Sequence, residues 1–329
     1  MPDATPNRWG GAAPNGWSIV RRNRVAMVCF WFLVALALVA IIVPFFMDPA
    51  LKETSPDSFL PPGAHSHDGR HFHLMGTDLN GQDMCYRLLT GAQVSLGVGL
   101  VGAVVSLLIG CVYGMVSGYA GGRVDGFMMR VVDMLSAIPS LLIVMLFIAA
   151  FEDYFQDALS ALRIWAQQRS WDWLSHFASG LSPYSRIIIL VFSLGLVEWL
   201  TMARIVRGQV LVLKELPFVT ASRAMGQRSW AILWKHLWPN LSTIVLTYLT
   251  LTIPAVIRNE SFLSFLGLGI DDPAASWGSL LKDGAQVINP LDSKWWLLVF
   301  PGVAMSASLL ALNFLGDGLR DAFDPRSRD

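Results

Sequence analysis

Charged side chains are scarce in this sequence. Asp, Glu, Lys and Arg together make up 15% of its 329 residues, and hydrophobic residues make up 54%. Soluble domains carry about 25% charged residues, so this composition excludes an ordinary soluble globular fold and indicates an integral membrane protein. The net charge of zero identifies no partner, because in a membrane protein the distribution of charge along the chain is more informative than its sum.

Cysteines are also few, and nucleotide-binding loops are absent. Cys29, Cys85 and Cys111 lie far apart, two of them in apolar runs, which favours neither a disulfide framework nor a thiolate metal site. The sequence has no G-x-x-x-x-G-K-[ST] loop and no G-x-G-x-x-G between a strand and a helix, the patterns that cradle phosphates. We therefore expect no cofactor on this chain and no nucleic-acid partner. If the chain takes part in active transport, the energy must come from another protein.

Apolar runs predict six transmembrane helices and an all-α polytopic fold. A membrane helix needs about 20 apolar residues, and six runs reach or approach that length: 25–47, 93–119, 134–150, 187–206, 241–262 and 295–315. The first run is longer than a signal-peptide core and lacks a small-residue cleavage site, so it is predicted to be retained. The second is rich in glycine, which suits close helix contact in lipid. We expect it inside the bundle.

Polar segments divide the chain around these runs. We expect a cytoplasmic tail over residues 1–24, disordered at its start, an extracytoplasmic loop over 48–92, and a polar cytoplasmic tail over 317–329. The five later helices then form a core over 93–316. Within that core, residues 152–183 place three Trp residues among charges, which predicts an amphipathic excursion at the extracytoplasmic membrane interface.

The distribution of basic residues predicts the orientation. Six spans place both termini on one side, and that side carries fifteen of the 24 Lys and Arg residues. Cytoplasmic loops are enriched in Lys and Arg, so both termini are predicted to be cytoplasmic. The basic segment 207–240 lies on the same side.

Segment 207–240 reads as a short helix–turn–helix. Pro217 can open a helix and Gly226 can end one in the left-handed conformation, which predicts a helix over 218–225. After the turn, Ser229 can cap a second helix that Pro239 closes. Its apolar residues recur at helical spacing; they are Trp230, Leu233, Trp234 and Leu237. A cytoplasmic segment with a small-residue face and an apolar stripe is a plausible socket for a partner, although a plain linking loop is the ordinary alternative.

Several motifs, in a consistent order, resemble the permease subunits of ABC importers for dipeptides and oligopeptides. They are GTDLNGQD, RLLTGAQVSLGVGL, DMLSAIPSLL, ARIVRGQVL, TASRAMG with HLWPN beginning ten residues after Gly226, ESFLSFLGLG and GDGLRDAFDPR. The resemblance covers residues 70–150 and 184–326. PAVIRNESFLSFLGLG and WLLVFPG resemble the oligopeptide branch, and importers of nickel and other small solutes share these motifs.

This resemblance implies that segment 207–240 is the coupling loop, whose helix docks in a groove of the ATPase subunit. The family usually has Glu-Ala-Ala followed three residues later by Gly. Here Thr220, Ala221 and Ser222 occupy the first three places and Gly226 the last. Thr in place of Glu removes a carboxylate, so docking is expected to depend on the small residues. The complete set of candidate coupling residues is Thr220, Ala221, Ser222, Arg223, Ala224, Gly226 and Arg228.

The resemblance also implies the partners and the location. They are a second homologous permease, paired through the glycine-rich faces, two ATP-binding subunits that hold ATP and Mg²⁺, an extracytoplasmic substrate-binding protein, and the lipid bilayer. The location implied is the bacterial cytoplasmic (inner) membrane. The chain itself is then not an enzyme.

Three ionisable residues are candidates for the translocation pathway. Glu198 lies within the fourth run, where an ionisable group is a functional candidate by default, although pairing with Arg204 is a structural alternative. Arg258 and Glu260 lie at the outer end of the fifth run and could instead be interfacial anchors or a mutual ion pair.

A histidine cluster in the extracytoplasmic loop is a candidate metal site. The stretch HSHDGRHFH contains His65, His67, His71 and His73, and imidazoles two residues apart can converge on a metal ion. The flanking Pro- and Gly-rich sequence predicts a solvated loop without a scaffold, which is the favoured interpretation.

Two other classes of protein remain as alternatives to an importer subunit. A membrane-embedded enzyme would need a convergent nucleophile and base, or metal ligands, within the spans, and there the sequence offers little besides Glu198. A channel would not need a cytoplasmic socket for a partner.

Overall fold

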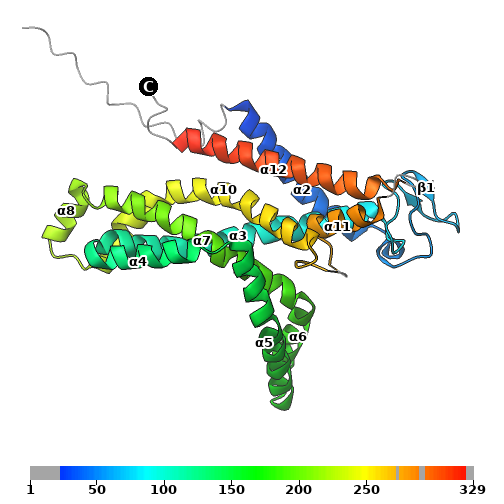
Figure 1. Cartoon of the computed structure of the whole chain (residues 1–329), viewed down its shortest axis with the longest axis horizontal. Coiled ribbons are helices and arrows are strands. Elements are labelled where there is room, and N and C mark those ends of the chain that lie inside the picture. Colours follow the sequence, from blue (N-terminus) through cyan, green and yellow to red (C-terminus); the bar gives the residue numbers. More distant parts are fainter. Residues whose placement is uncertain (1–22, 272–273, 289–292, 324–329) are drawn as a thin grey trace, which may run out of the picture.

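The computed structural model describes residues 23–271, 274–288 and 293–323. Within these ranges the helices form an elongated bundle from which one helical pair projects sideways (Figure 1). In chain order the elements are α2 (Arg24–Phe46), η1 (Pro49–Lys52), β1 (Ala64–His65), β2 (Phe72–His73), α3 (Met84–Ala120), α4 (Gly122–Ser136), α5 (Ser140–Gln168), α6 (Asp172–Leu181), η2 (Ser182–Tyr184), α7 (Ser185–Leu213), α8 (Pro217–Ala224), α9 (Ser229–Ile232), the π-helical turn η3 (Leu233–Leu237), α10 (Trp238–Phe265), α11 (Trp277–Val287) and α12 (Trp296–Phe323).

The helices confirm an all-α polytopic membrane protein. Four are long and apolar enough to cross a membrane: α2, α3, the continuous stretch of α6 and α7, and α12. Two bent pairs raise the number to six if each pair is one span: α4 with α5, and Ser229–Ser242 with Ile244–Phe265. The expected six spans are consistent with this count among the described residues.

Helix α3 lies at the centre of the bundle and packs against α7 through glycines. A Cβ atom built at Gly110 would lie 2.6 Å from Cβ of Met202, and one at Gly114 would lie 2.6 Å from the carbonyl oxygen of Ala203. Real Cβ atoms essentially never come so close, so these positions require glycine. The expectation that this helix lies inside the bundle agrees with its contacts.

Other glycines of α3 pack against a different helix. Gly99 and Gly102 contact Ile257 and Val256 of α10, just as the glycines further along α3 contact α7. These positions are therefore occupied by helices of the same chain, whereas Gly97 has open space beside it. Pairing with a second permease through the glycine-rich faces stays a prediction.

The N-terminal helix α2 is attached to the bundle at both of its ends. Its first turn is capped by Asn23, whose side-chain oxygen accepts hydrogen bonds from the amides of Val25 and Ala26. Ala26 packs so closely on α12 that a Cβ at Gly318 would lie 2.5 Å from its methyl group. Near the other end, the Gln93 amide of α3 donates to the Ala40 carbonyl at 2.5 Å.

The third predicted span is broken. Helix α4 ends at Ser136 and α5 begins at Ser140, and their axes differ by 86°. Pro139 is the cause, because its ring cannot continue a helix from the preceding turn and its extended backbone caps α5. A single straight span over 134–150 is therefore wrong.

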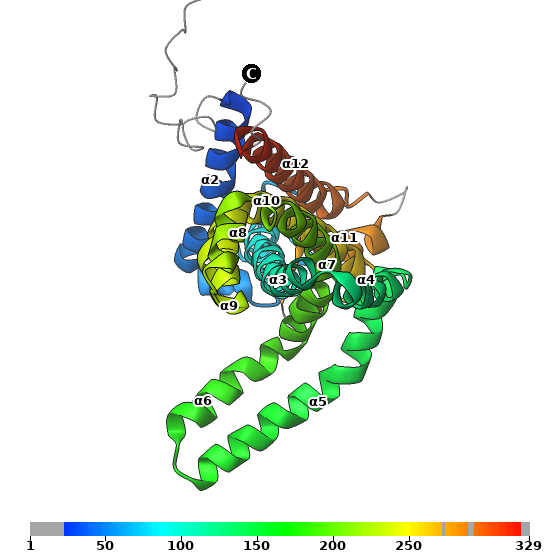
Figure 2. The ribbon, with the colours of Figure 1, turned by 90° about the vertical axis from the view of Figure 1, so that its left-hand side faces the viewer.

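Residues 152–183 form most of a helical hairpin. Helix α5 continues to Gln168, and α6 returns beside it, so that the pair projects away from the bundle (Figures 1 and 2). At its tip the Trp165 and Trp171 rings are 5.3 Å apart, and the Arg169 guanidinium lies 4.7 Å from the Trp165 ring. Placement of this segment at the membrane interface stays a prediction.

Most other boundaries differ by extension of the helices. Helix α3 begins nine residues before the predicted run, because Asp83 caps it by accepting a hydrogen bond from the Tyr86 amide at 2.9 Å. Helix α12 continues to Phe323, into the predicted polar tail. The expected disorder at the start of the chain lies outside the described residues.

Candidate functional site

The predicted coupling helix is present as α8. Pro217 is its first residue, and Gly226 follows it with a φ of +77°, which is the left-handed conformation that glycine adopts without strain. Two of its side chains face inward: Val219 is fully buried and Ser222 is 3% exposed. Val219 belongs to an apolar cluster with Val210 of α7 and Leu237 of η3, so α8 is held firmly on the end of the bundle.

The opposite side of α8 is open. We define the coupling surface as five exposed residues of α8 and its C-cap: Phe218, Thr220, Ala221, Ala224 and Met225. Three of the seven predicted coupling residues, Thr220, Ala221 and Ala224, lie on this surface. Gly226 and Arg228 follow the end of α8, and the other two are placed differently. Ser222 points into the protein, and the Arg223 guanidinium lies over the Tyr119 ring of α3 at 5.3 Å. Ser222 is therefore buried within this chain, and the Arg223 guanidinium already has a contact within it.

The second predicted helix of this segment is continuous with the next span. Arg228, not Ser229, is the N-cap of α9, and no side chain caps it. Pro239 does not end the helix, because it follows the π-helical turn η3 and the chain continues as α10. The apolar stripe is divided: Leu233 and Leu237 are buried, whereas Trp230 is 62% exposed.

His236 joins the two parts of the segment and was not identified from the sequence. Its Nε2 lies 3.1 Å from Oε1 of Gln227 and 3.3 Å from Oγ of Ser222. The Ser222 hydroxyl also bonds to the Phe218 carbonyl at 2.8 Å. This link between α8 and the π-helical turn explains why Ser222 faces inward. Its sequence separation of 14 residues gives no local signal.

A charged link fixes α4 to α7 close to the coupling segment. Arg207 donates from Nε and Nη2 to the two carboxylate oxygens of Asp125, at 2.5 and 2.6 Å. Ser117 of α3 donates to Asp125 at 2.6 Å, and Lys214 donates to the Gly118 carbonyl at 2.9 Å. Three helices are therefore connected by hydrogen bonds at the end that carries α8.

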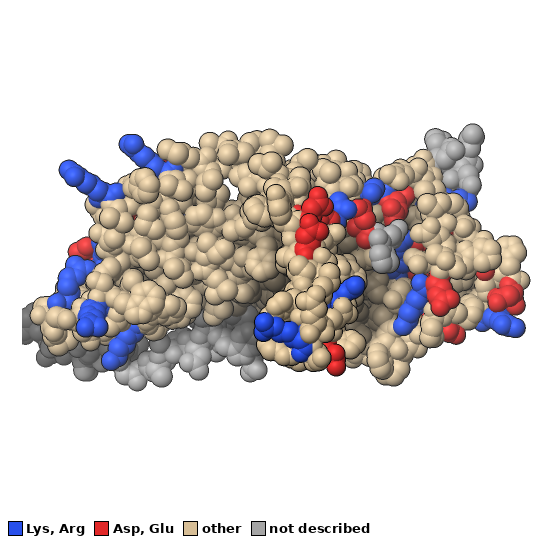
Figure 3. All heavy atoms as spheres, turned by 90° about the horizontal axis from the view of Figure 1, so that it is seen from below, with Lys and Arg blue, Asp and Glu red and all other residues tan. Residues whose placement is uncertain are grey.

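Charge is distributed unevenly along the bundle. Figure 3 shows Lys and Arg gathered at the end that carries α8, a wide belt without charged side chains beside it, and mixed acidic and basic residues over the other half. The basic end includes Arg223, Arg228 and Lys235. An uncharged belt flanked by charged ends is what a lipid bilayer requires.

A second candidate site lies where α4 and α5 meet. A cavity of about 400 Å³ there is lined by residues of the α4–α5 bend and of α7, including Glu198 and Arg204. Glu198 accepts a hydrogen bond from the Asn259 amide at 3.0 Å. Arg204 donates instead to Ser136 at 2.6 Å and to Asp133 at 3.2 Å. The alternative that Glu198 pairs with Arg204 is therefore wrong.

Arg258 and Glu260 form no ion pair among the described residues, so the alternative of a mutual pair does not hold. Arg258 is exposed and acts electrostatically on Glu198. Glu260 is fully buried and accepts hydrogen bonds from Ser264 at 2.8 Å and Ser261 at 3.1 Å. Of the three candidate pathway residues, the structure brings Glu198 and Arg258 together. Glu260 lies apart from them.

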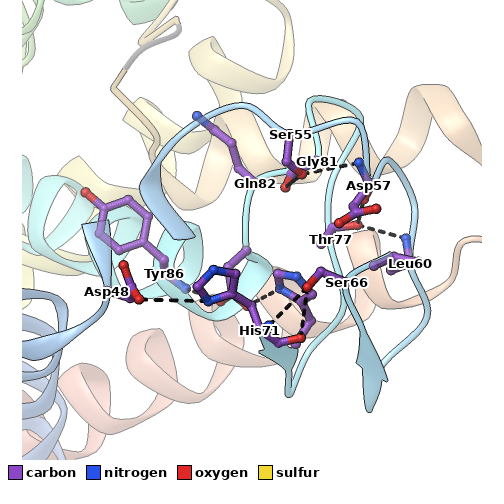
Figure 4. Close-up of polar contacts among 12 residues, drawn as sticks. Asp48, Ser55, Asp57, Leu60, Ser66, His71, Thr77, Gly81, Gln82 and Tyr86 are labelled. Atoms are coloured by element: carbon purple, nitrogen blue, oxygen red, sulfur yellow. Dashed lines mark hydrogen bonds and ion pairs between the residues drawn. The ribbon is translucent and has the colours of Figure 1, made fainter. Parts of the chain in front are cut away.

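The histidine cluster lies in an ordered lobe, contrary to the expectation of a loop without a scaffold. Strands β1 and β2 pair antiparallel, and the Thr77 hydroxyl bridges Asp57 and Leu60 (Figure 4). Three histidines each face a different carboxylate: His67 with Asp57, His71 with Asp48 and His73 with Asp83. His65 instead lies beside the Phe72 ring, with the two ring planes tilted by 54°.

These histidines do not converge. No group of three or more His, Cys, Asp or Glu residues that could hold a metal ion occurs among the described residues. His73 and Asp83 are both buried, with a distance of 2.8 Å between Nδ1 and Oδ2. The pair therefore helps to hold the start of α3, which Asp83 caps.

Comparison with known proteins agrees with the motifs. Residues 87–329 match the family model described as the binding-protein-dependent transport system inner membrane component. Residues 15–62 match the N-terminal transmembrane domain of oligopeptide transport permease C.

Curated relatives match over nearly the whole chain. The dipeptide transport system permease protein DppC of Bacillus subtilis is 37% identical over 95% of this chain and 86% of its own length. The oligopeptide transport system permease protein OppC of Escherichia coli is 36% identical over 95% of this chain and 92% of its own length.

A solved structure of the MetNI methionine ABC transporter in inward-facing conformations aligns with 73% of this chain and 98% of its own, with 17% identity and a TM-score of 0.49. Assignment to a family therefore rests on the sequence relatives. The chain belongs to the family of binding-protein-dependent transport system inner membrane components, the permease subunits of ABC importers.

Proposed function

We propose that this permease forms half of a pathway that imports peptides, with oligopeptides favoured over nickel or another small solute. The relatives named as dipeptide and oligopeptide permeases each match 95% of this chain, which supports this substrate class. A second permease supplies the other half of the pathway, and an extracytoplasmic binding protein delivers the peptide.

Two ATP-binding subunits supply the energy, and one of them docks on the coupling surface of this chain. The single observation that carries this assignment is the division of α8 into a buried side, with Val219 and Ser222, and an open side, with Ala221 and Ala224. Small residues allow the backbone of a partner to approach closely. Because α8 is packed onto the bundle, a movement imposed on it is passed to α7 and α10 rather than absorbed by a loose loop.

This docking requires α8 and both termini to be cytoplasmic, as the positive-inside rule predicts. The arrangement in Figure 3 supports it, since the basic residues gather at the α8 end. A permease with the opposite orientation would present α8 to a compartment without ATP.

Co-purification tests the docking. Ala221→Trp places a large ring on the coupling surface and disturbs no buried contact, so the variant should insert normally but lose the ATP-binding subunits. Ala161→Trp is a matched control, because Ala161 is an exposed helical alanine on the distant hairpin. Full retention of the ATP-binding subunits by Ala221→Trp contradicts the assignment.

Uptake tests the substrate. Vesicles that contain the complete transporter and its binding protein should accumulate a labelled tripeptide on addition of ATP. Competition by excess nickel without competition by unlabelled peptide would favour the small-solute alternative.

A further inference from the structure

The cavity at the α4–α5 bend contains a carboxylate, Glu198, that uses one of its two oxygens in a hydrogen bond with the described residues. Oε1 of Glu198 accepts the hydrogen bond from Asn259, whereas Oε2 accepts none from the described residues. The side chain is half-buried and lines the cavity. Arg204, the other charged residue that lines it, is already bonded to Asp133 and Ser136.

A carboxylate at this depth in the membrane is energetically unfavourable unless water or a binding partner solvates it. Glu198 is the fourteenth of the 29 residues of α7, which puts it near the middle of a helix that spans the membrane. An ionised group there faces either a water-filled cavity or a partner. Substrate sites of transporters are commonly found near the midplane beside interrupted helices, and the 86° break between α4 and α5 is such an interruption.

Nearby groups orient Glu198 without neutralising it fully. Asn259 is uncharged and fixes one carboxylate oxygen, and Arg258 is exposed and acts at a longer range than a direct ion pair. The remaining oxygen can accept a charge-assisted hydrogen bond from a cation in the cavity. A metal ion is disfavoured there, because no group of three potential ligands occurs among the described residues.

We propose that Glu198 receives the α-ammonium group of the peptide as it passes the α4–α5 bend. Peptides differ in their side chains, but nearly all carry this group, which offers three N–H donors and a positive charge. A weak site for it allows varied sequences to pass in one orientation. The inference rests on the proposed peptide substrate and adds a residue and a chemical feature of the substrate to it.

Uptake of two peptides by the complete transporter tests this site. The pair is trialanine and N-acetyl-trialanine, and the ratio of their uptake rates is measured with wild-type permease and with Glu198→Gln. Because the same binding protein delivers the peptides in both cases, a change in the ratio must come from the permease. We expect the ratio to fall about tenfold, as for loss of one charge-assisted hydrogen bond, with little change for the acetylated peptide.

Controls separate this inference from a structural role and from the proposed function. Glu53→Gln removes an exposed carboxylate outside the cavity and should leave the ratio unchanged. An equal loss of both peptides in Glu198→Gln, or an unchanged ratio, overturns the inference. If that variant does not assemble, Glu198→Asp, which keeps the charge but shortens its reach, should lower the ratio, and an unchanged ratio again overturns it. Failure of the wild type to import either peptide would instead count against the proposed function.

Discussion

Arg207 of α7 donates two hydrogen bonds to the carboxylate of Asp125 of α4, at 2.5 and 2.6 Å. Bidentate pairs of this kind fix orientation as well as distance. Because α7 leads directly into α8, this pair connects the coupling surface to α4. Helix α4 in turn ends at the bend that lines the cavity with Glu198. The two candidate sites are therefore connected by one path through α7 and α4.

Asp125→Asn should weaken this path. The substitution removes the charge and one of the acceptor oxygens, so we expect about 2 kcal/mol of lost stabilisation for a partly buried charged pair. The purified complex should melt at a lower temperature, and its binding-protein-stimulated ATPase rate should fall. Asp133→Asn is the control, because its single bond to Arg204 is long and exposed, and such pairs contribute little. Equal effects of the two substitutions would argue against a special role for Asp125.

His236→Ala should loosen α8. Loss of the imidazole leaves Ser222 and Gln227 without their shared partner, so α8 keeps the apolar contact through Val219 and the contact of Arg223 with Tyr119. Hydrogen exchange measured by mass spectrometry should become faster over residues 217–224, with α3 unaffected. Unchanged protection of this peptide would show that packing alone holds the helix.

Thr220→Glu should leave transport intact or improve it. Thr220 lies on the coupling surface and bonds only to carbonyls of its own helix, so the longer side chain meets no obstacle. A carboxylate is also favoured in the first half of a helix by its dipole. The test is the ATPase rate with binding protein and peptide present, and uncoupling of hydrolysis from transport would show that the coupling surface is wrongly placed.

The hairpin of α5 and α6 should lie along the outer membrane interface. One flank is apolar, with Phe151 and Tyr154 beside Phe192 of α7, and the other is polar, with Glu152 near Arg186. Spin labels in a cysteine-free background at Tyr154→Cys and Asp153→Cys test this. The first should be relaxed mainly by oxygen and the second mainly by a water-soluble nickel chelate. Equal access of the nickel chelate to both would place the hairpin in water, and shielding of position 154 from both reagents would indicate a covering subunit.

Local signals in the sequence predicted much of this architecture, and long-range contacts account for the rest. Pro217 and Gly226 predict the ends of the coupling helix because each acts through its own backbone. The sharp break at Pro139 could not be predicted from the sequence, since membrane helices often tolerate proline and only the surrounding helices decide whether the chain turns.

The candidate sites show the same division. The exposure of Ala221 follows from the spacing of residues in the segment. The inward orientation of the Ser222 side chain instead depends on His236, 14 residues away. The order of the histidine lobe likewise depends on distant pairs, such as the Thr77 hydroxyl with the Asp57 carbonyl. Apolar periodicity carries no information about such pairs.

Photocrosslinking from the coupling surface tests the central claim most directly. A photoreactive phenylalanine analogue replaces Phe218 in the assembled transporter, where it adds little bulk to a side chain that is already aromatic and exposed. The same substitution at Phe177, an exposed residue of α6 on the hairpin, is the control. We predict an adduct at position 218 with the mass of this permease plus one ATP-binding subunit, and none with that subunit at position 177. An adduct of the ATP-binding subunit at position 177, or its absence at position 218 in an assembled and active complex, would contradict the assignment of the coupling surface.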